Sequence, residues 1–186
     1  MFHGGLAAYA FYGAIGIWGV GETVLQVRTR SEERDPSYVW MVVGSVLGLV
    51  LAFRAAVSGS RLPGPSWAPS VVGVALMCGG MLLRYWSVRT LGRFFTVRVE
   101  VGADHELVDT GPYTVLRHPS YTGMLLVYLG AGVALDSWLS VAAAVLLPAG
   151  AVVKRIRHEE RLLRSRLGAR YVDYARRTRR LVPGVW

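Results

Sequence analysis

The sequence predicts an all-α integral membrane protein with about five transmembrane helices, and its composition and the spacing of its charges carry this prediction. Of the 186 residues, 53% are hydrophobic and only 18% are charged, whereas charged residues make up about a quarter of an ordinary soluble domain. The charges are also bunched, so that long uncharged stretches alternate with short charged ones. This pattern is typical of a bundle of membrane-spanning helices in a single domain.

Five apolar segments have lengths suited to crossing a membrane, which takes about 20 residues of helix. The fourth and fifth lie between Tyr121 and Val153, and the polar pair Asp136-Ser137 splits them at a point suited to a tight helical hairpin. Residues 1–68 then form the N-terminal helices, and residues 69–186 form the functional core of a single membrane domain, 1–186. We expect the first three segments at Leu6–Val27, Tyr38–Val57 and Pro69–Val88.

The basic residues predict the orientation of these helices. The chain carries 21 Lys+Arg against 12 Asp+Glu, a net charge of +9. Three regions are rich in basic residues: the loop after the first segment, the polar stretch from Arg89 to Ser120 and the tail from Lys154 to Trp186. In the loops at the opposite ends of the segments, Arg61 is the one basic residue. Because cytoplasmic loops are enriched in Lys and Arg, we expect the N-terminus outside and the tail in the cytoplasm. A basic tail beside a membrane favours anionic lipid head groups over nucleic acid as its partner.

Three ionisable residues lie in or near the ends of the apolar segments: Glu22, Arg54 and Arg84. An ionisable group within a membrane suggests a functional site, but a long side chain near a helix end can also extend to the interface. The second interpretation is favoured for Glu22 and Arg54. For Arg84 both interpretations stay open, because its end of the third segment faces the polar stretch.

Glycines also recur within the apolar segments, with Gly44 and Gly48 four residues apart and Gly13, Gly16 and Gly19 three apart. Small residues at such spacing let helices approach closely. They can serve a dimer face or packing inside one bundle, and packing inside one bundle is the favoured interpretation.

The polar stretch between the third and fourth segments has the pattern of an ordered site. Phe95–Val101 alternates apolar and polar residues with period two, which predicts a strand, and Glu106–Val108 can return as a second short strand after a turn. Pro119 suits the first turn of a helix, where its missing N–H costs nothing. We therefore expect His118 and Tyr121 to flank the cytoplasmic mouth of the fourth segment.

The tail begins as a basic helix with one apolar stripe. Arg155 and Glu159 are four residues apart and share a face of this helix. They can form a simple ion pair, or their face can cover the stretch that contains His118. The apolar stripe consists of Ile156, Leu163, Leu167, Tyr171 and Tyr174.

Two general kinds of cofactor site are disfavoured by the sequence. No G-x-G-x-x-G run follows a predicted strand, which argues against a Rossmann-type dinucleotide site. The four histidines lack a recognisable zinc-binding spacing, so we expect no metal.

Two runs in the second half of the chain resemble the isoprenylcysteine carboxyl methyltransferase family. The first is His105-Glu-Leu-Val-Asp-Thr-Gly-Pro-Tyr113 with Arg117-His-Pro-Ser-Tyr-Thr-Gly123, and the second is Arg155-Ile-Arg-His-Glu-Glu160 with Tyr171 and Tyr174 downstream. The resemblance covers roughly Leu91 to Pro183. It implies an S-adenosylmethionine-dependent methyltransferase that acts on a lipophilic acceptor at the membrane.

The resemblance also implies the residues of the site. It places an arginine for the acceptor's carboxylate at Arg155, and it places Glu159 on the tail helix against the cofactor. Catalysis would then fall to Arg155 and Glu159. The implied cofactor contacts are Arg98, His105, Glu106, Leu107, Val108, Tyr113, His118, Pro119, Ser120, Tyr121 and Glu159.

The implied chemistry agrees with the residue types. A carboxylate acceptor is already ionised near neutral pH and needs no general base, so positioning can supply most of the catalysis.

Lys154 is the only lysine, a bias typical of a GC-rich genome, so we expect a bacterial inner membrane. Such a source leaves the acceptor open among an isoprenoid or fatty acid, a phenolic lipid and a phospholipid amine.

Two other hypotheses remain at this point. A membrane reductase of the sterol-reductase type has a similar bundle and would bind NADPH in preference to S-adenosylmethionine. A lipid-binding protein whose tail contacts anionic lipid would bind liposomes in a salt-sensitive way and would take no small-molecule cofactor.

Overall fold

The computed structural model describes residues 5–28, 36–95 and 107–184, and every regular element within these ranges is a helix. The predicted all-α class is confirmed for this part of the chain. Two short 3-10 helices, η1 and η2, come after α3 in the sequence. The elements are α1 (Gly5–Arg28), α2 (Pro36–Ala55), α3 (Ala68–Leu91), η1 (Gly92–Phe94), η2 (Gly111–Thr114), α4 (Pro119–Ala134), α5 (Trp138–Leu167) and α6 (Ala169–Arg177).

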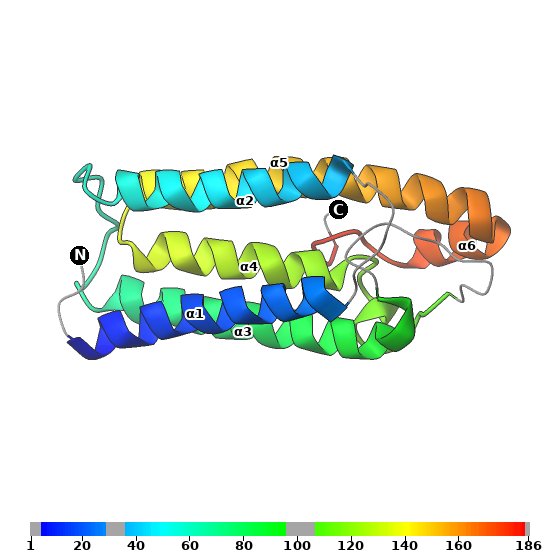
Figure 1. The fold of residues 1–186 in the computed structure, drawn as a ribbon, viewed down its shortest axis with the longest axis horizontal. Helices are drawn as coiled ribbons and strands as arrows, with labels where there is room; N and C mark the ends of the chain where they lie inside the picture. Colours follow the sequence, from blue (N-terminus) through cyan, green and yellow to red (C-terminus); the bar gives the residue numbers. More distant parts are fainter. Residues whose placement is uncertain (1–4, 29–35, 96–106, 185–186) are drawn as a thin grey trace.

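The five long helices run along a common direction in two outer pairs around a central helix (Figure 1). α2 packs along α5, α1 lies against α3, and α4 lies between the two pairs and packs against both α3 and α5. Neighbouring helices in the chain alternate in direction, so the ends of α1 and α3, the start of α4 and the second half of α5 meet at one end of the bundle (Figure 1).

Three described helices are long and apolar enough to cross a membrane by length and composition: α2, α3 and α5. α4 has only 16 residues, or about 24 Å of helix at 1.5 Å per residue, which is short of the hydrocarbon thickness of about 30 Å. The expected total of five spans therefore stays a prediction, as does the orientation of the two termini.

The helix boundaries agree with the hydropathy pattern in some places and depart from it in others. α4 ends at Ala134 and α5 begins at Trp138, so the predicted hairpin at Asp136-Ser137 is confirmed. By contrast, α5 continues without a break past Val153, and the fifth segment and the tail helix are one helix of 30 residues. That helix ends at Gly168, whose φ of 55° is a conformation that glycine adopts without strain.

The two strands predicted for the polar stretch are not seen among the described residues. The first, Phe95–Val101, lies outside the described ranges except for Phe95. Of the second, Glu106–Val108, only Leu107 and Val108 are described, and neither is in a regular element.

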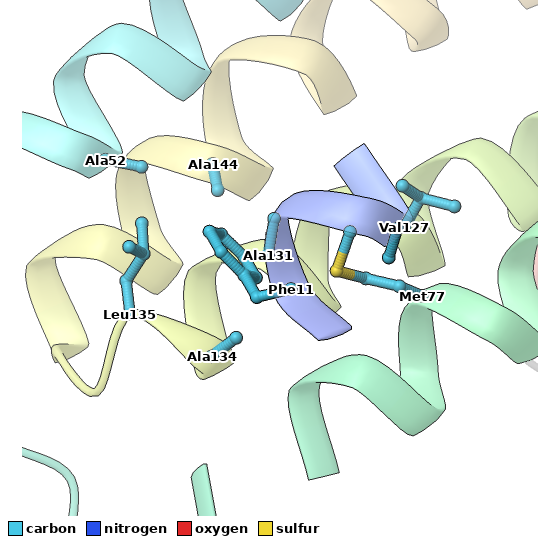
Figure 2. Packing of buried hydrophobic residues seen from close by; sticks show 9 residues of the cluster. Phe11, Ala52, Met77, Val127, Ala131, Ala134, Leu135 and Ala144 are labelled. Carbon is cyan, nitrogen blue, oxygen red and sulfur yellow. The ribbon is translucent and has the colours of Figure 1, made fainter. Parts of the chain in front are cut away.

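The apolar core joins all five long helices and extends to the hairpin between α4 and α5 (Figure 2). Phe11 of α1 and Met77 of α3 are fully buried there, and the ring of Phe11 packs against that of Phe53 of α2 at a centroid distance of 6.0 Å. Val127 and Ala131 contribute from α4, and α5 contributes Ala144. The core therefore fixes α4 in the centre, with its first turn at the polar end of the bundle.

α3 and α4 approach so closely that glycine is required at both sides of two contacts. A Cβ placed on Gly80 would lie 2.5 Å from the carbonyl oxygen of Gly123, and one on Gly123 would lie 2.6 Å from the carbonyl oxygen of Gly80. Gly73 and Gly130 form a second reciprocal pair, with both distances 2.5 Å. Two helix backbones in direct contact leave no room for a methyl group, so the register of α4 against α3 is fixed.

The glycines singled out by sequence spacing behave in two ways. A Cβ on Gly48 would lie 2.9 Å from the carbonyl oxygen of Ala143 of α5, and one on Gly44 would contact Ala151. These two therefore serve packing inside the bundle. In contrast, a Cβ on Gly13, Gly16 or Gly19 would have nothing within 4 Å among the described residues.

We expect Gly80→Ala to lower the stability of the protein by about 1 to 3 kcal/mol, because the added methyl group forces α3 and α4 apart. The matched control is Gly16→Ala, which adds the same methyl group at an open position and should be neutral or slightly stabilising, since alanine favours helix. Thermal unfolding of both variants in detergent measures the difference. Equal unfolding midpoints would contradict the assigned register of α3 and α4.

Candidate functional site

The first turn of α4 begins at Pro119, as its sequence predicts, and lies at the polar end of the bundle. The residue before it, His118, has the non-helical φ and ψ of −128° and 53°, and its carbonyl accepts a hydrogen bond from the N–H of Tyr121 at 3.1 Å. His118 and Tyr121 also stack, with ring centroids 5.8 Å apart and planes 23° from parallel. The two aromatic rings therefore pack with nearly parallel planes at the start of α4.

The tail returns to this turn and pairs with its backbone. The N–H of Arg117 donates to the carbonyl of Arg179 at 2.6 Å, and that of His118 donates to the carbonyl of Arg180 at 3.1 Å. In the opposite direction, the N–H of Arg179 donates to the carbonyl of Val115 at 2.9 Å. The tail beyond α6 is thus fixed alongside the segment that leads into α4.

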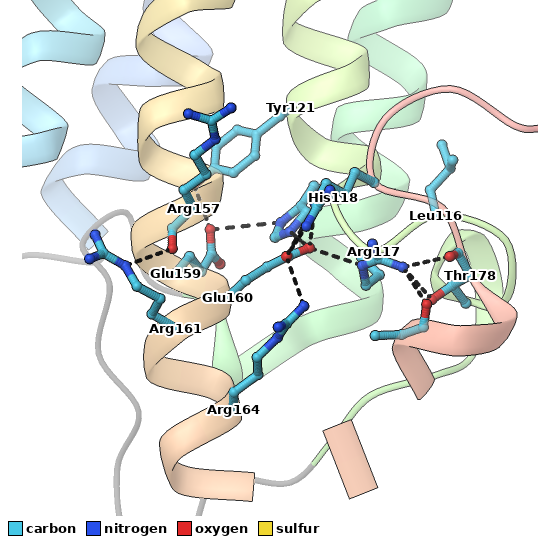
Figure 3. Close-up of polar contacts among 12 residues, drawn as sticks. Leu116, Arg117, His118, Tyr121, Arg157, Glu159, Glu160, Arg161, Arg164 and Thr178 are labelled. Carbon is cyan, nitrogen blue, oxygen red and sulfur yellow. Dashed lines mark hydrogen bonds and ion pairs between the residues drawn. The ribbon is translucent and has the colours of Figure 1, made fainter. Parts of the chain in front are cut away.

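The hydroxyl of Tyr121 links two side chains of α5. Arg155 donates from Nε to this hydroxyl at 2.6 Å, and the hydroxyl donates to Oε2 of Glu159 at 3.0 Å. The same carboxylate oxygen lies 3.8 Å from Nδ1 of His118, a contact that Figure 3 draws between α5 and the start of α4. An arginine, a tyrosine, a carboxylate and an imidazole therefore meet where α4 contacts α5.

Arg155 is almost fully enclosed, with 2% of its surface exposed. Its Nη1 donates to Oγ of Ser37 at 3.2 Å, and its guanidinium carbon lies 5.9 Å from the ring centroid of Tyr38. Both residues belong to the first turns of α2. α2, α4 and α5 therefore share this one cation, which holds a fixed position.

Glu160 is the anion that fastens the tail to the site (Figure 3). Its carboxylate accepts hydrogen bonds from Nε of Arg117 at 3.0 Å and from Nη2 of Arg180 at 2.9 Å. It also lies 3.5 Å from Nε2 of His118. The side chain of Glu160 is only 5% exposed, so the partners compensate the cost of burying its charge. The bond from Glu160 raises the pKa of Arg180 further above its already high ordinary value.

Two buried tyrosines hold the segment before α4 against α6. The hydroxyl of Tyr174 donates to the backbone carbonyl of Tyr113 at 2.8 Å. Burial raises the pKa of both phenols above the ordinary value, and the charge of Glu159 raises that of Tyr113 further. Both hydroxyls therefore stay protonated, and Tyr174 remains a hydrogen-bond donor at any physiological pH.

The structure brings together most of the residues that the sequence resemblance implies. Leu107 and Val108 are described and half-buried, in the segment that leads to η2. Arg98, His105 and Glu106 lie outside the described residues. Those gathered around the first turn of α4 are Tyr113, His118, Pro119, Ser120, Tyr121, Arg155 and Glu159.

Three residues of this cluster were not singled out by the sequence analysis. Glu160 is adjacent to Glu159, Arg117 directly precedes His118, and Arg180 lies in the arginine-rich end of the tail. The tail contains nine other arginines, so no local signal separates Arg180 from them. The adjacent pair of glutamates was the available signal for Glu160, since neighbouring residues on a helix point about 100° apart and serve different partners.

Comparisons with known proteins agree with this arrangement. A solved structure of the eukaryotic intramembrane Ras methyltransferase ICMT has the same fold, with a TM-score of 0.69 over 96% of this chain and 67% of that chain, at 23% sequence identity. Protein-S-isoprenylcysteine O-methyltransferase B of Arabidopsis thaliana is 35% identical over 121 residues, which are 64% of this chain and 61% of the relative. The nickel-cobalt-cadmium resistance protein NccN of Alcaligenes xylosoxydans xylosoxydans is 33% identical over 151 residues, 78% of this chain and 63% of the relative.

By its fold, the protein is a helical bundle with a buried polar site at the first turn of its central helix. The model of the phospholipid methyltransferase family matches residues 69–170, more than half of the chain. The chain therefore belongs to this family, and the family-level resemblance to the isoprenylcysteine carboxyl methyltransferases is confirmed. The chain spans about three-fifths of the length of the plant relatives that it matches.

We expect Glu160→Ala to destabilise the protein by about 3 kcal/mol, because it leaves the buried cation of Arg117 without its anion. Asp173→Ala is the control, since Asp173 pairs with Arg176 on the exposed face of α6 and exposed pairs contribute little. Unfolding in detergent, with limited proteolysis of the tail, measures both effects. A Glu160→Ala protein as stable and as protease-resistant as the control would show that Glu160 does not fasten the tail.

Proposed function

We propose that the chain is an S-adenosylmethionine-dependent methyltransferase that methylates the carboxylate of a lipophilic acceptor at the cytoplasmic face of a membrane. One observation carries the proposal beyond family membership. Arg155 and Glu159, one helical turn apart on α5, both bond to the hydroxyl of Tyr121 at the first turn of α4. A cation suited to an acceptor's carboxylate and an anion suited to a cationic donor are thus held side by side.

The residues present fit a sulfonium donor. The side chain of Glu159 is 28% exposed, so its carboxylate is accessible beside the stacked rings of His118 and Tyr121. Compact organic cations bind favourably to aromatic faces and to carboxylates. S-adenosylmethionine supplies an electrophilic methyl group on a positively charged sulfur, and Glu159 with the two rings would bind and orient it.

Arg155 would bind and orient the acceptor. A guanidinium offers a planar fork of donors that matches both oxygens of a carboxylate. Its burial strengthens this attraction, and the bonds to Tyr121 and Ser37 set its direction. The carboxylate acceptor is ionised near neutral pH, so these residues need only hold it in line with the donor. Positioning of this kind can lower the activation barrier by several kcal/mol, up to about 7 to 11.

The surroundings of Arg155 support a lipophilic acceptor. The neighbouring turns of α2 carry exposed apolar side chains, among them Val39, Trp40 and Val43. The apolar part of an acceptor would lie among such side chains and enter from the side of the bundle, whereas the polar donor would enter from the end where the tail lies. The proposed orientation places this end in the cytoplasm.

Methylation of a phospholipid amine is the second candidate, because the matching family model is described as phospholipid methyltransferase. An amine must lose a proton to become a nucleophile, so this reaction needs a base. Of the candidate residues, Glu159 would have to serve in that role.

Turnover with a methyl-labelled donor tests the proposal. Purified protein should label a long-chain or isoprenoid carboxylic acid, and the product should release its label in mild base, as methyl esters do and N-methyl amines do not. We expect Arg155→Gln to raise KM for the acid at least about tenfold, the effect of losing a hydrogen bond between charged groups. The exposed Arg157, changed to Gln, is the matched control. Label found only in aminophospholipid would favour the second candidate, and consumption of NADPH would favour a reductase.

We expect the rate with a carboxylic acid to be flat between about pH 6 and pH 8, because a carboxyl group of pKa near 4 is fully ionised throughout this range. An amine or phenol acceptor would give a rate that rises with pH over the same range. Initial rates at saturating donor measure the profile, and a parallel unfolding scan controls for stability. A rising profile with the acid would contradict the assignment of Arg155 to an ionised acceptor.

A further inference from the structure

A second buried arginine contacts the first turn of α4 from the side opposite Arg155. Arg84 of α3 donates from Nη1 to Oγ of Ser120 at 2.7 Å, and from Nη2 to Oε2 of Glu22 of α1 at 2.7 Å. Its Nε donates to the other oxygen of the same carboxylate. The guanidinium carbon also lies 5.5 Å from the ring centroid of Trp18. One side chain therefore connects α1, α3 and α4.

The side chain of Arg84 is enclosed within the bundle. Its side chain is 7% exposed and that of Glu22 is 22% exposed, and α3 continues for two further turns, to Leu91. A buried ion pair within a bundle is costly unless each charge is fully satisfied. Here the two parallel bonds to Glu22 satisfy the charge, and the remaining side of the fork is directed to Ser120.

We propose that Arg84 is a positioning residue for the site, which it orients through Ser120. Ser120 and Tyr121 are consecutive residues of the first turn of α4, and each accepts a hydrogen bond from a different buried arginine. Arg84 acts from α3 and Arg155 from α5, so the turn is held from both sides. The inference rests on the proposed function, because a misplaced Tyr121 would weaken binding of the donor beside Glu159.

The packing of α3 against α4 is built around this arginine. A Cβ on Gly123 would lie 2.8 Å from the backbone nitrogen of Arg84 and 3.1 Å from its Cβ. Because Gly123 has no side chain, the backbone of Arg84 can pack directly against α4. From this position the side chain of Arg84 reaches Ser120. A lysine has a single ammonium and lacks the planar fork, so it cannot hold both oxygens of Glu22 and Ser120 in one fixed geometry.

The experiment compares Arg84→Lys with Ser140→Ala. Ser140 is fully buried and donates to the carbonyl of Ala52 at 2.7 Å, so its loss removes an interhelical bond at the other end of the bundle. Two quantities are measured for each variant: the affinity for S-adenosylhomocysteine by calorimetry, and amide hydrogen exchange of residues 117–122 without ligand. We expect Arg84→Lys to weaken the affinity about tenfold and to speed the exchange, and we expect Ser140→Ala to change neither.

A double-mutant cycle tests the route through Ser120. If Arg84 acts through that hydroxyl, the losses of affinity in Arg84→Lys and Ser120→Ala will not add in the double variant. Additive losses would overturn the proposal. Where Arg84→Lys does not fold, Ser120→Ala alone keeps the pair of Arg84 with Glu22 and must still speed exchange in the first turn.

The outcomes separate this inference from the proposed function. Wild-type protein that is folded and binds no S-adenosylhomocysteine would contradict the proposed function, while faster exchange in Arg84→Lys would still support the positioning role of Arg84. Normal affinity and unchanged exchange in Arg84→Lys would overturn the inference and leave the proposed function intact.

Discussion

The polar site of this protein depends on how buried arginines are neutralised at the first turn of α4. A buried cation is stable only when an anion and enough acceptors surround it. Arg84 has Glu22 and Ser120, and Arg117 has Glu160 together with backbone carbonyls of Ala175 and Thr178. Each of these contacts joins segments that are distant in the sequence. The charges therefore fix the relative positions of α1, α3, α4 and the tail as well as the chemistry available between them.

The packing of the apolar helix faces also positions the first turn of α4. The reciprocal glycine contacts of α3 and α4 allow the two backbones to touch, which sets Arg84 beside Ser120. On the other face of α4, the continuous helix α5 carries Val152 and Ile156 into the core and Arg155 and Glu159 into the site. A break in α5 at the end of its apolar part would separate these site residues from the part of the helix that packs in the core. The contacts among Tyr121, Arg155 and Glu159 are thus an extension of the core, carried by α4 and α5.

Much of the helical architecture could be predicted from the sequence, because hydropathy and turn residues are local signals. The extent of α1 and the hairpin at Asp136-Ser137 follow from them, and Pro119 marks the start of α4. The continuity of α5 could not be predicted in this way, since the change from apolar to charged residues at Lys154 resembles a boundary although the backbone continues as helix. The recurring residue types around His118 and Glu159 were enough to indicate the family.

The contacts between distant residues could not be predicted from one sequence. Glu22 and Arg84 each lie near the end of an apolar segment, and only the register of α1 against α3 shows that they form a pair. Similarly, the choice of Arg180 among the arginines of the tail depends on how α6 turns back after Gly168. Such pairings are properties of the packed structure, because they require the relative shift and rotation of two helices.

We propose that the first turn of α4 and the adjoining face of α5 bind a sulfonium methyl donor. Calorimetric titration of the purified protein in detergent with S-adenosylhomocysteine, with NADPH titrated in parallel, tests it most directly. Saturable binding of S-adenosylhomocysteine, lost in Glu159→Gln, with no heat from NADPH, is the predicted result. Folded protein that binds NADPH alone, or that binds neither compound, would contradict the account.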